Sequence, residues 1–515
     1  MNIRVAYTSI LILLLSIPVG TFAQQKTIPL NRFRQIEIDM QRSRPDTISQ
    51  QGMRPFLESR IDLTETFGYA EDTSKYYYKA SVKLFRDNLF IVDVPGFYLT
   101  IDPLLDVGLG HDYSDVTELQ DTALIFNNTR GARMAGDIGK RVSFESSVYE
   151  NQTRFPAYMT EYVNARGVVP GQGRIKPFKN GAFDYSSSYG WVSVTPIDQL
   201  NLQIGHGKNF IGHGYRSMLL SDNTSNYPFL KAQYTALDDK LQYTWIYAGL
   251  QTLERLPLGE VPESLFKRKS ASFYYLSYSP HPMVELGLFE GMIWQRWDTT
   301  GTLPLQGEMF IPLIGVNSGL FGLDNANNSV IGLNIRLNPL KGTVFYGQIL
   351  TDDFSNKLAY QIGARQYNVL AKNLHLQVEY NRATAETYAA TQGFQSYTHM
   401  NQSLAHPSGS EFEEVVGILN YRYKSFYTQI KAHMLRHDES QLGEPAVYVD
   451  RVGLIGVSQT NVIDAQVGIY VNPKTSLNVA LGFIHRYWQI AGIDQRTDWF
   501  YFTLRTSLFN KYYDF

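Results

Sequence analysis

The sequence FYTQIKAHM, from Phe426 to Met434, decides the fold. Its alternate positions, counted from Phe426, are mostly apolar, whereas Gln429, Lys431 and His433 between them are polar. A period of two sends successive side chains to opposite faces of a β-strand. One face of this strand suits lipid and the other suits a wet lumen, which is typical of a transmembrane β-barrel.

The same alternation recurs along most of the chain, for example from Leu374 to Asn381 and from Leu477 to Phe483. Segments of about ten residues with this period match tilted membrane strands. We therefore predict an all-β transmembrane barrel of about 18 antiparallel strands over residues 103–515. The predicted strands begin near Leu104, Ala123, Arg141, Ser187, Leu200, Tyr227, Leu241, Ala271, Met283, Ser329, Gly342, Leu358, Leu374, Glu414, Ser425, Val462, Leu477 and Trp499.

The connections between these segments alternate in length. Short turns are predicted at positions such as Gly139-Lys140 and Asp238-Asp239, and long connections at positions such as His206 to Asn226 and Ala383 to Phe412. Short periplasmic turns and long extracellular loops are typical of a barrel in the outer membrane of a Gram-negative cell. The alternation favours this class over a soluble secreted β protein.

Residues 1–23 have the pattern of a secretory signal peptide. A basic residue at Arg4 precedes a short apolar run, and small residues end at Ala23, so the mature chain is expected to begin near Gln24. At the other end, Trp499 to Leu508 is expected to be a final strand, and Phe515 resembles the terminal signal read by the barrel-assembly machinery.

Residues 24–102 do not share the barrel pattern and are expected to form an α-containing periplasmic or lumen-plugging segment. Leu30, Phe33, Ile36 and Met40 recur at near-helical spacing and predict a helix that ends before Pro45. An 18-stranded barrel is wide enough to need filling.

Charge and cysteine content exclude several classes of function. The 46 basic and 48 acidic residues nearly cancel, so nucleic acid is not an expected partner. The chain has no cysteine, which excludes disulfides and thiolate zinc sites. No metal or other cofactor is expected. Segments such as His213 to Ser217 and His437 to Ser440 lack a recognisable nucleophile context, so an enzyme is not expected either.

Four stretches carry a resemblance to known proteins: Tyr149 to Lys176, Ile204 to Lys231, Gly287 to Gln295 and Met400 to Phe412. They resemble the gliding-motility-associated, RemB-like outer-membrane proteins and the wider capsule-assembly Wzi family. The resemblance implies an 18-stranded barrel with an N-terminal helical portion. It also implies a lectin-like function, in which polar residues outside the cell retain extracellular or capsular polysaccharide in gliding motility or capsule attachment.

We interpret the polar, glycine-rich stretch from Leu202 to Lys231 as a surface-side loop that carries this function. Planar amide, carboxylate and guanidinium groups can match sugar hydroxyls, and an acidic polysaccharide would also pair with Arg166, Arg174 and Lys176. The alternative is that Arg216 and Asp222 pair with one another and brace the loop inside the lumen. The candidate ligand-binding residues are Lys208, Asn209, Tyr215, Arg216, Ser217, Asp222, Asn223 and Tyr227.

The expected partners are outer-membrane lipid, extracellular or capsular polysaccharide, and other gliding or surface proteins. Two alternatives to polysaccharide binding stay open at this point. One is a passive or gated porin, and the other is a scaffold for surface motility proteins. A porin and a lectin both need a polar lumen, so the sequence does not separate them.

Overall fold

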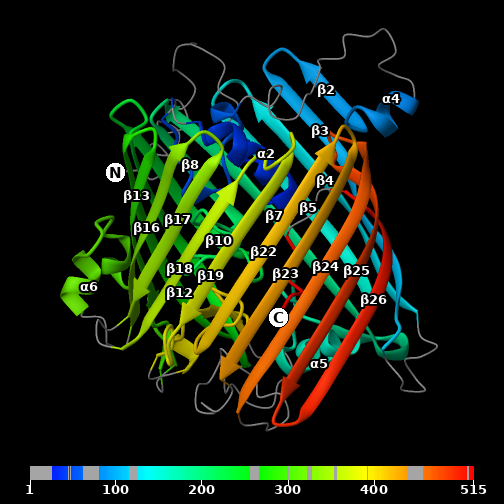
Figure 1. The fold of residues 1–515 in the computed structure, drawn as a ribbon. Coiled ribbons are helices and arrows are strands. Elements are labelled where there is room, and N and C mark those ends of the chain that lie inside the picture. Colours follow the sequence, from blue (N-terminus) through cyan, green and yellow to red (C-terminus); the bar gives the residue numbers. More distant parts are fainter. Residues whose placement is uncertain are drawn as a thin grey trace.

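The wall of the molecule is a closed antiparallel β-barrel, seen from the side in Figure 1. The structure, a computed structural model, describes residues 26–44, 46, 48–61, 80–114, 124–255, 266–298, 301–321, 327–352, 356–390, 393–438, 456–506 and 510–515. Within these ranges the wall has 18 strands, as predicted. The last strand closes on the first, with Trp499 opposite Asp112 and Arg505 opposite Asp106.

The wall strands, in chain order, are β3 (Phe97–Asp112), β4 (Ile125–Ile138), β5 (Val142–Arg154), β7 (Ala182–Ile197), β8 (Leu200–Gly207), β10 (Tyr227–Ala236), β11 (Leu241–Arg255), β12 (Phe266–His281), β13 (Val284–Trp294), β16 (Asn328–Leu340), β17 (Thr343–Thr351), β18 (Leu358–Gln366), β19 (Leu374–Ala383), β22 (Phe412–Tyr423), β23 (Phe426–Asp438), β24 (Val457–Asn472), β25 (Leu477–Ile490) and β26 (Ile493–Arg505). Each predicted segment corresponds to one of these strands. The largest difference is at Leu104, because β3 already begins at Phe97.

The two faces of the strands separate as the alternation predicts. In β23, Ile430 and Met434 are 42% and 56% exposed on the outer face, whereas Lys431 and His433 are buried on the inner face. The same division holds in β19, where Val378 is exposed and its polar neighbours are buried. The outer face can therefore contact hydrocarbon while the inner face meets a polar lumen.

The two ends of the barrel differ in their connections. β7 and β8 are joined through Asp198 and Gln199 at one end, whereas β8 and β10 are joined by a long connection at the other. The long-loop end, at the bottom of Figure 1, also carries one tight turn, at Ala491 and Gly492 between β25 and β26. By the usual asymmetry of outer-membrane barrels, the long-loop end faces outward from the cell.

Short elements complete the fold. The helices are α2 (Arg32–Arg42), α4 (Ala80–Phe85), α5 (Ala157–Arg166) and α6 (Val316–Phe321), with single 3-10 turns η1 (Glu58–Arg60), η2 (Lys179–Gly181), η3 (Gly307–Phe310) and η4 (Gly393–Gln395). The short strands are β1 (Met53–Arg54), β2 (Phe90–Val94), β6 (Lys176–Phe178), β9 (Phe210–Ile211), β14 (Trp297–Asp298), β15 (Gly301–Thr302), β20 (Thr398–His399) and β21 (Gln402–Ser403). The predicted helix before Pro45 is thus confirmed as α2. None of the helices described is both long and apolar enough to span a membrane.

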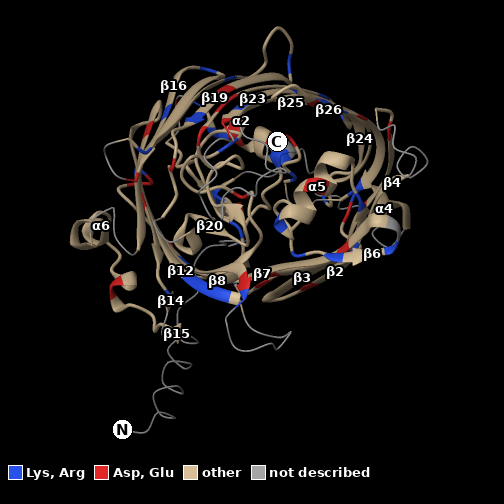
Figure 2. Cartoon of the chain, turned by 90° about the horizontal axis from the view of Figure 1, so that it is seen from below, with Lys and Arg blue, Asp and Glu red and all other residues tan. Residues whose placement is uncertain are grey.

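The lumen is occupied by segments from distant parts of the chain. Figure 2 shows α2, α5 and β20 inside the ring of strands, with the C-terminal end beside them. We call the described residues 26–61, 155–175, 208–226, 384–411 and 510–515 the lumen plug. β1 and β9 join two of these segments in a small antiparallel sheet, in which Met53 lies opposite Ile211.

Two expectations about the chain ends have different outcomes. The proposed signal peptide, residues 1–23, lies outside the described residues, and the division at residue 102 stays a prediction. Phe515 does not end the last strand, because β26 stops at Arg505. Instead, Phe515 packs in the lumen against Tyr158 and Tyr162 around α5.

The position of each outer-face residue along the membrane normal gives a first prediction. In the apolar row of β23 from Phe426 to Met434, Ile430 is central and Phe426 is terminal. Ile430→Arg is expected to cost about 2–4 kcal/mol of folding free energy, and Phe426→Arg about 0–1 kcal/mol, because the penalty for charge falls toward the interface. Urea titrations of vesicle-embedded protein measure both. Equal costs would contradict this placement of the membrane.

Candidate functional site: the lumen plug and the extracellular rim

The stretch from Leu202 to Lys231 folds into the lumen rather than along the surface. β8 and β10 belong to the wall, and the residues between them turn inward. All eight predicted ligand-binding residues are buried in the described structure. The expectation of a surface-side loop is therefore wrong in its location, because the polar groups of the loop have partners inside the protein.

Lys208 and Asn223 hold the loop to neighbouring plug segments. The Lys208 ammonium donates hydrogen bonds to the Gly171 carbonyl at 2.5 Å and to the Asp222 carbonyl at 3.0 Å. The Asn223 amide donates to the Ser403 carbonyl at 2.7 Å. Burial lowers the pKa of Lys208 to about 8. These contacts fasten the loop to the connections after β5 and β19.

Asn209, Ser217 and Tyr227 also make internal contacts. The Ser217 hydroxyl donates to the Ile211 carbonyl at 2.5 Å, which closes a turn within the loop. The backbone N–H of Asn209 donates to the Tyr227 hydroxyl at 3.3 Å. The loop is thus stabilised by its own side chains as well as by its neighbours.

Arg216 lies at the centre of a buried charge network. Its guanidinium donates to the Glu414 carboxylate, with N–O distances of 2.9 and 3.1 Å, and lies 3.2 Å from the Asp514 carboxylate. His406 and His433 each place Nε2 at 2.7 Å from Glu414. Glu414 of β22 therefore ties the loop and the segment that carries His406 to the wall, and Arg216 adds the C-terminal residues through Asp514.

Tyr215 and Asp222 connect the loop to the C-terminal residues. The Tyr215 hydroxyl donates to Asp514 at 2.7 Å, while Asp222 accepts hydrogen bonds from Tyr512 at 2.5 Å and Asn510 at 2.8 Å. Arg216 and Asp222 both lie inside the lumen, as the alternative expectation held, but their partners are different residues.

The N-terminal segment forms the other side of the plug. Asp39 of α2 accepts hydrogen bonds from Arg54 at 2.9 Å and from Arg365 of β18 at 2.8 Å. Glu285 of β13 accepts from the backbone N–H groups of Gln51 and Gly52. Buried carboxylates are thus paired with cations or backbone donors, as their burial requires.

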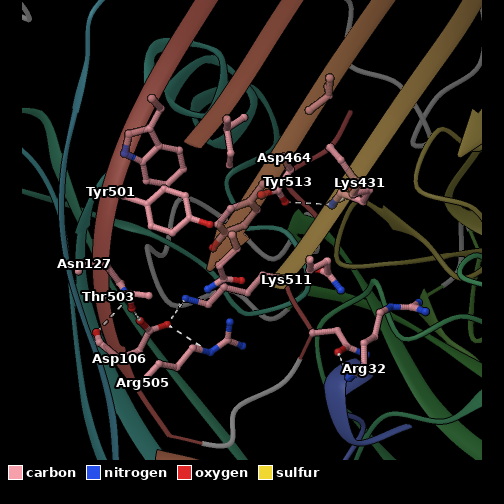
Figure 3. Close-up of a pocket in the computed structure, with 18 of the residues that line it drawn as sticks. Arg32, Asp106, Asn127, Lys431, Asp464, Tyr501, Thr503, Arg505, Lys511 and Tyr513 are labelled. Atoms are coloured by element: carbon pink, nitrogen blue, oxygen red, sulfur yellow. Dashed lines mark hydrogen bonds and ion pairs between the residues drawn. The ribbon is translucent and has the colours of Figure 1, made fainter. Parts of the chain in front are cut away.

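A cavity of about 210 Å³ remains between the plug and the wall around β26. Figure 3 shows Arg505 and Lys511 pointing toward Asp106, and Lys431 beside Asp464. The cavity is smaller than the roughly 300–1,000 Å³ of typical small-molecule sites. Lys431, Arg505 and Lys511 already face carboxylates of the wall, so the cavity offers no evident place for a polymer.

The extracellular rim carries a different arrangement, in which cations lie over aromatic rings. The guanidinium groups of Arg174 and Arg255 lie 4.5 and 5.0 Å from the ring centre of Phe266. The Lys267 ammonium lies 4.3 Å from the Trp297 ring and 5.2 Å from that of Phe394. Both arginines are exposed and the rings are half-buried. We call these six residues, Arg174, Arg255, Phe266, Lys267, Trp297 and Phe394, the rim cluster.

Of the rim cluster, only Arg174 was predicted from sequence. Lys176 is also exposed, at the start of β6, whereas Arg166 is buried and donates to the Asn401 carbonyl at 3.0 Å. The sequence signal for Phe266 and Lys267 was the run from Phe266 to Lys269, which combines an aromatic ring with three cations. Figure 2 shows the basic start of β12 at the rim.

Comparisons with known proteins agree with this fold. The structure is similar to that of Wzi, an outer-membrane protein involved in group 1 capsule assembly in Escherichia coli and described as a carbohydrate-binding β-barrel, with a TM-score of 0.58 and 11% identity over 94% of this chain and 100% of that one. The chain is an outer-membrane β-barrel.

More distant similarity extends to OprD of Pseudomonas aeruginosa, with a TM-score of 0.44 and 10% identity over 79% of this chain and 94% of that one. OccAB4 of Acinetobacter baumannii has a TM-score of 0.44 and 11% identity over 78% of this chain and 97% of that one. No protein-family model matches the sequence, and no curated protein matches it. Among the described residues of this barrel, no group of His, Asp and Glu has an arrangement that could hold a metal ion.

The charge network predicts how the plug responds to mutation. Arg216→Met removes the cation that faces Glu414 and Asp514, and breaking a buried pair costs about 3–5 kcal/mol. We expect the plug to loosen and ion conductance across a planar bilayer to rise. Arg268→Met, which removes an exposed cation at the start of β12, serves as the control. A closed Arg216→Met barrel would contradict a sealing role for the network.

Three plug histidines predict a response to acid. Burial lowers the pKa of His213 to about 4, that of His406 to about 4 and that of His399 to about 3. The unfolded loops bind protons near pH 6.5, so the ordered plug binds fewer protons below that pH and loses stability as pH falls from about 6.5 to about 4.

Bilayer conductance should therefore rise over this range, and it should rise less in a triple His→Gln variant at positions 213, 399 and 406. A conductance that does not change with acid would show that these histidines are not part of what keeps the plug ordered.

Proposed function

We propose that the protein binds acidic cell-surface polysaccharide through its extracellular rim cluster. The observation that carries this proposal is the pairing of cations with aromatic rings at the end of the barrel that faces outward, where Arg174 and Arg255 are exposed. The similarity of the fold to a carbohydrate-binding barrel supports it. The predicted plug residues, being buried, then serve as the support of the rim.

The chemistry of the rim cluster suits such a ligand. The apolar C–H face of a sugar can cover a half-exposed ring such as Trp297, and a guanidinium such as that of Arg255 can form charge-assisted hydrogen bonds with a sugar carboxylate. Cations held over rings by cation–π attraction keep their charge at the surface. Glu254, which pairs with Lys267 at 2.6 Å, is positioned to limit binding to ligands that can displace it.

The wall contributes by fixing the plug segment that carries Phe394. Lys269, two residues after Lys267 on β12, is buried and donates hydrogen bonds to the Ser396 carbonyl at 2.7 Å and to the Thr398 hydroxyl at 2.9 Å. These bonds hold the loop after β19 against β12. Phe394 and Trp297 can then meet edge to face, with their ring centres 5.8 Å apart.

In the cell, this binding would retain extracellular or capsular polysaccharide at the surface, either in capsule attachment or in gliding motility as the sequence resemblance implies. Other surface proteins of a gliding apparatus would then be additional partners. A gated porin is the second candidate, and the cavity beside β26, whose lining includes the charged side chains of Lys431 and Arg505, favours it. Conductance of the wild-type protein separates the two, because a polysaccharide-binding barrel does not need an open passage.

Polysaccharide binding by purified, detergent-folded protein tests the proposal. The ligand is the surface polysaccharide of the producing strain, and the rim variant is Arg255→Ser/Trp297→Ser. We expect the rim variant to lose at least about tenfold in affinity, since each lost contact is worth about 1 kcal/mol or more. The plug variant Lys208→Ala/Arg216→Ala/Asp222→Ala should bind more tightly than the rim variant if it folds.

The control Arg130→Ser/Glu150→Ser removes an exposed ion pair on the outer wall and should bind as wild type does. Heat-modifiable gel mobility verifies folding of every variant. Loss of binding in the plug variant alone would move the site into the lumen, and a wild type that does not bind would refute the proposal.

A further inference from the structure

The seam between the first and last wall strands is built from three segments instead of two. β26 pairs with β3 only from Asp112 to Asp106. From Ile101 to Phe97, the strand on the same side of β3 is β2, with Phe90 opposite Ile101. Pro103, which has no N–H to donate, lies in the interval where the partner changes, as expected for proline beside a break in pairing.

The length of the β3 edge that β26 and β2 share shows why β2 is needed. Phe500 lies opposite His111. It is the first apolar, outward-facing residue of β26 on the periplasmic side of the polar Arg496 and Asp498. Phe90 lies opposite Ile101, ten residues further along β3. Ten residues of a strand tilted by about 40° span about 25 Å along the membrane normal, which is the height of the apolar band of such barrels. β26 alone ends about halfway across this band, counted from the extracellular side.

The outer face of β2 continues the lipid-facing rows of the wall. Phe90 stands in one row with Ile101 and with Met134 of β4, and all three are exposed. Val94 stands in a second row with Phe97, which in turn lies opposite the exposed Ile138. Phe90 is 61% exposed and Val94 49%. Such rows of exposed apolar residues are unfavourable in water.

The helix before β2 extends the same apolar surface. Leu84 and Phe85 of α4, and Leu89 after it, are all exposed. α4 lies at the outer edge of the barrel in both Figure 1 and Figure 2. The segment is fastened by polar contacts: Asn472 of β24 donates to the Asp87 carbonyl at 2.8 Å, and the Leu89 N–H donates to the Asp102 carboxylate at 2.8 Å.

We infer that α4 and β2, residues 80–94, are embedded in the periplasmic leaflet of the outer membrane, where they complete the lipid-facing wall on the periplasmic side of the end of β26. The occupant of their exposed apolar face is phospholipid. The segment is then part of the membrane anchor and belongs neither to the plug nor to a free periplasmic domain. Continuity with the apolar rows of β3 and β4 is the argument for lipid instead of a protein partner.

Single-cysteine labelling tests this inference directly, since the chain has no cysteine of its own. An environment-sensitive fluorophore is attached to Phe90→Cys or Val92→Cys in the full chain, folded into phosphatidylcholine vesicles. Lipids that carry a spin label near the headgroup should quench the fluorophore at position 90 or 92. The extent of this quenching should match that of a fluorophore on Ile430→Cys by lipids whose spin label lies deeper in the acyl chain. Iodide in the water should quench both positions weakly.

Two matched positions act as controls. Asp93→Cys lies on the opposite face of β2 and Gln429→Cys lies on the lumen face of β23, so both should escape the lipid quenchers. Iodide quenching at positions 90 and 92 without lipid quenching would overturn the inference and favour a protein partner for this face. If Phe90→Cys does not fold, Val94→Cys on the same outward face of β2 replaces it.

Discussion

The structure depends on one constraint: a backbone that crosses lipid must satisfy every N–H and C=O within the protein. A sheet meets this constraint only by closing, so the pairing of β26 with β3 is what makes the wall possible. The alternation along each strand follows from the same constraint, since each closed strand has one face in hydrocarbon and the other in the lumen. The apolar and polar rows of β23 are the plainest case.

Closure creates a second physical problem, because a wide lumen lined by polar groups must be filled or left wet. The chain fills the lumen with segments whose charged side chains face groups of the opposite charge. Arg216 faces Glu414 and Asp514, and Asp39 faces Arg54 and Arg365. A buried ion pair adds little stability compared with an apolar substitute, but an unpaired ion is costly. Such pairs therefore specify how the segments fit together more than they stabilise the whole.

The sequence was sufficient for the wall but not for the plug. Periodicity is a local property: a period of two predicted the strand count and the strand positions, and near-helical spacing predicted helix α2. The partners of Arg216 could not, because Glu414 and Asp514 are about 200 and 300 residues away along the chain. A polar, glycine-rich loop has the same composition whether it faces water or a polar lumen, so the location of Lys208 and Asn223 could not be inferred. β2 was missed as part of the wall because Pro103 and the short length of the strand interrupt the periodic pattern.

The path of the last residues has a consequence for the order of events in biogenesis. Residues 510–515 follow the strand that closes the barrel, and they return into the lumen to contact Tyr215, Arg216 and Asp222. Because residues 510–515 come after every wall strand in the chain, these contacts can form only once all of the wall strands have been synthesised. The interior therefore acquires its finished arrangement after the last wall strand has been made, and a nascent chain that stops at β26 lacks the contacts that tie its centre together.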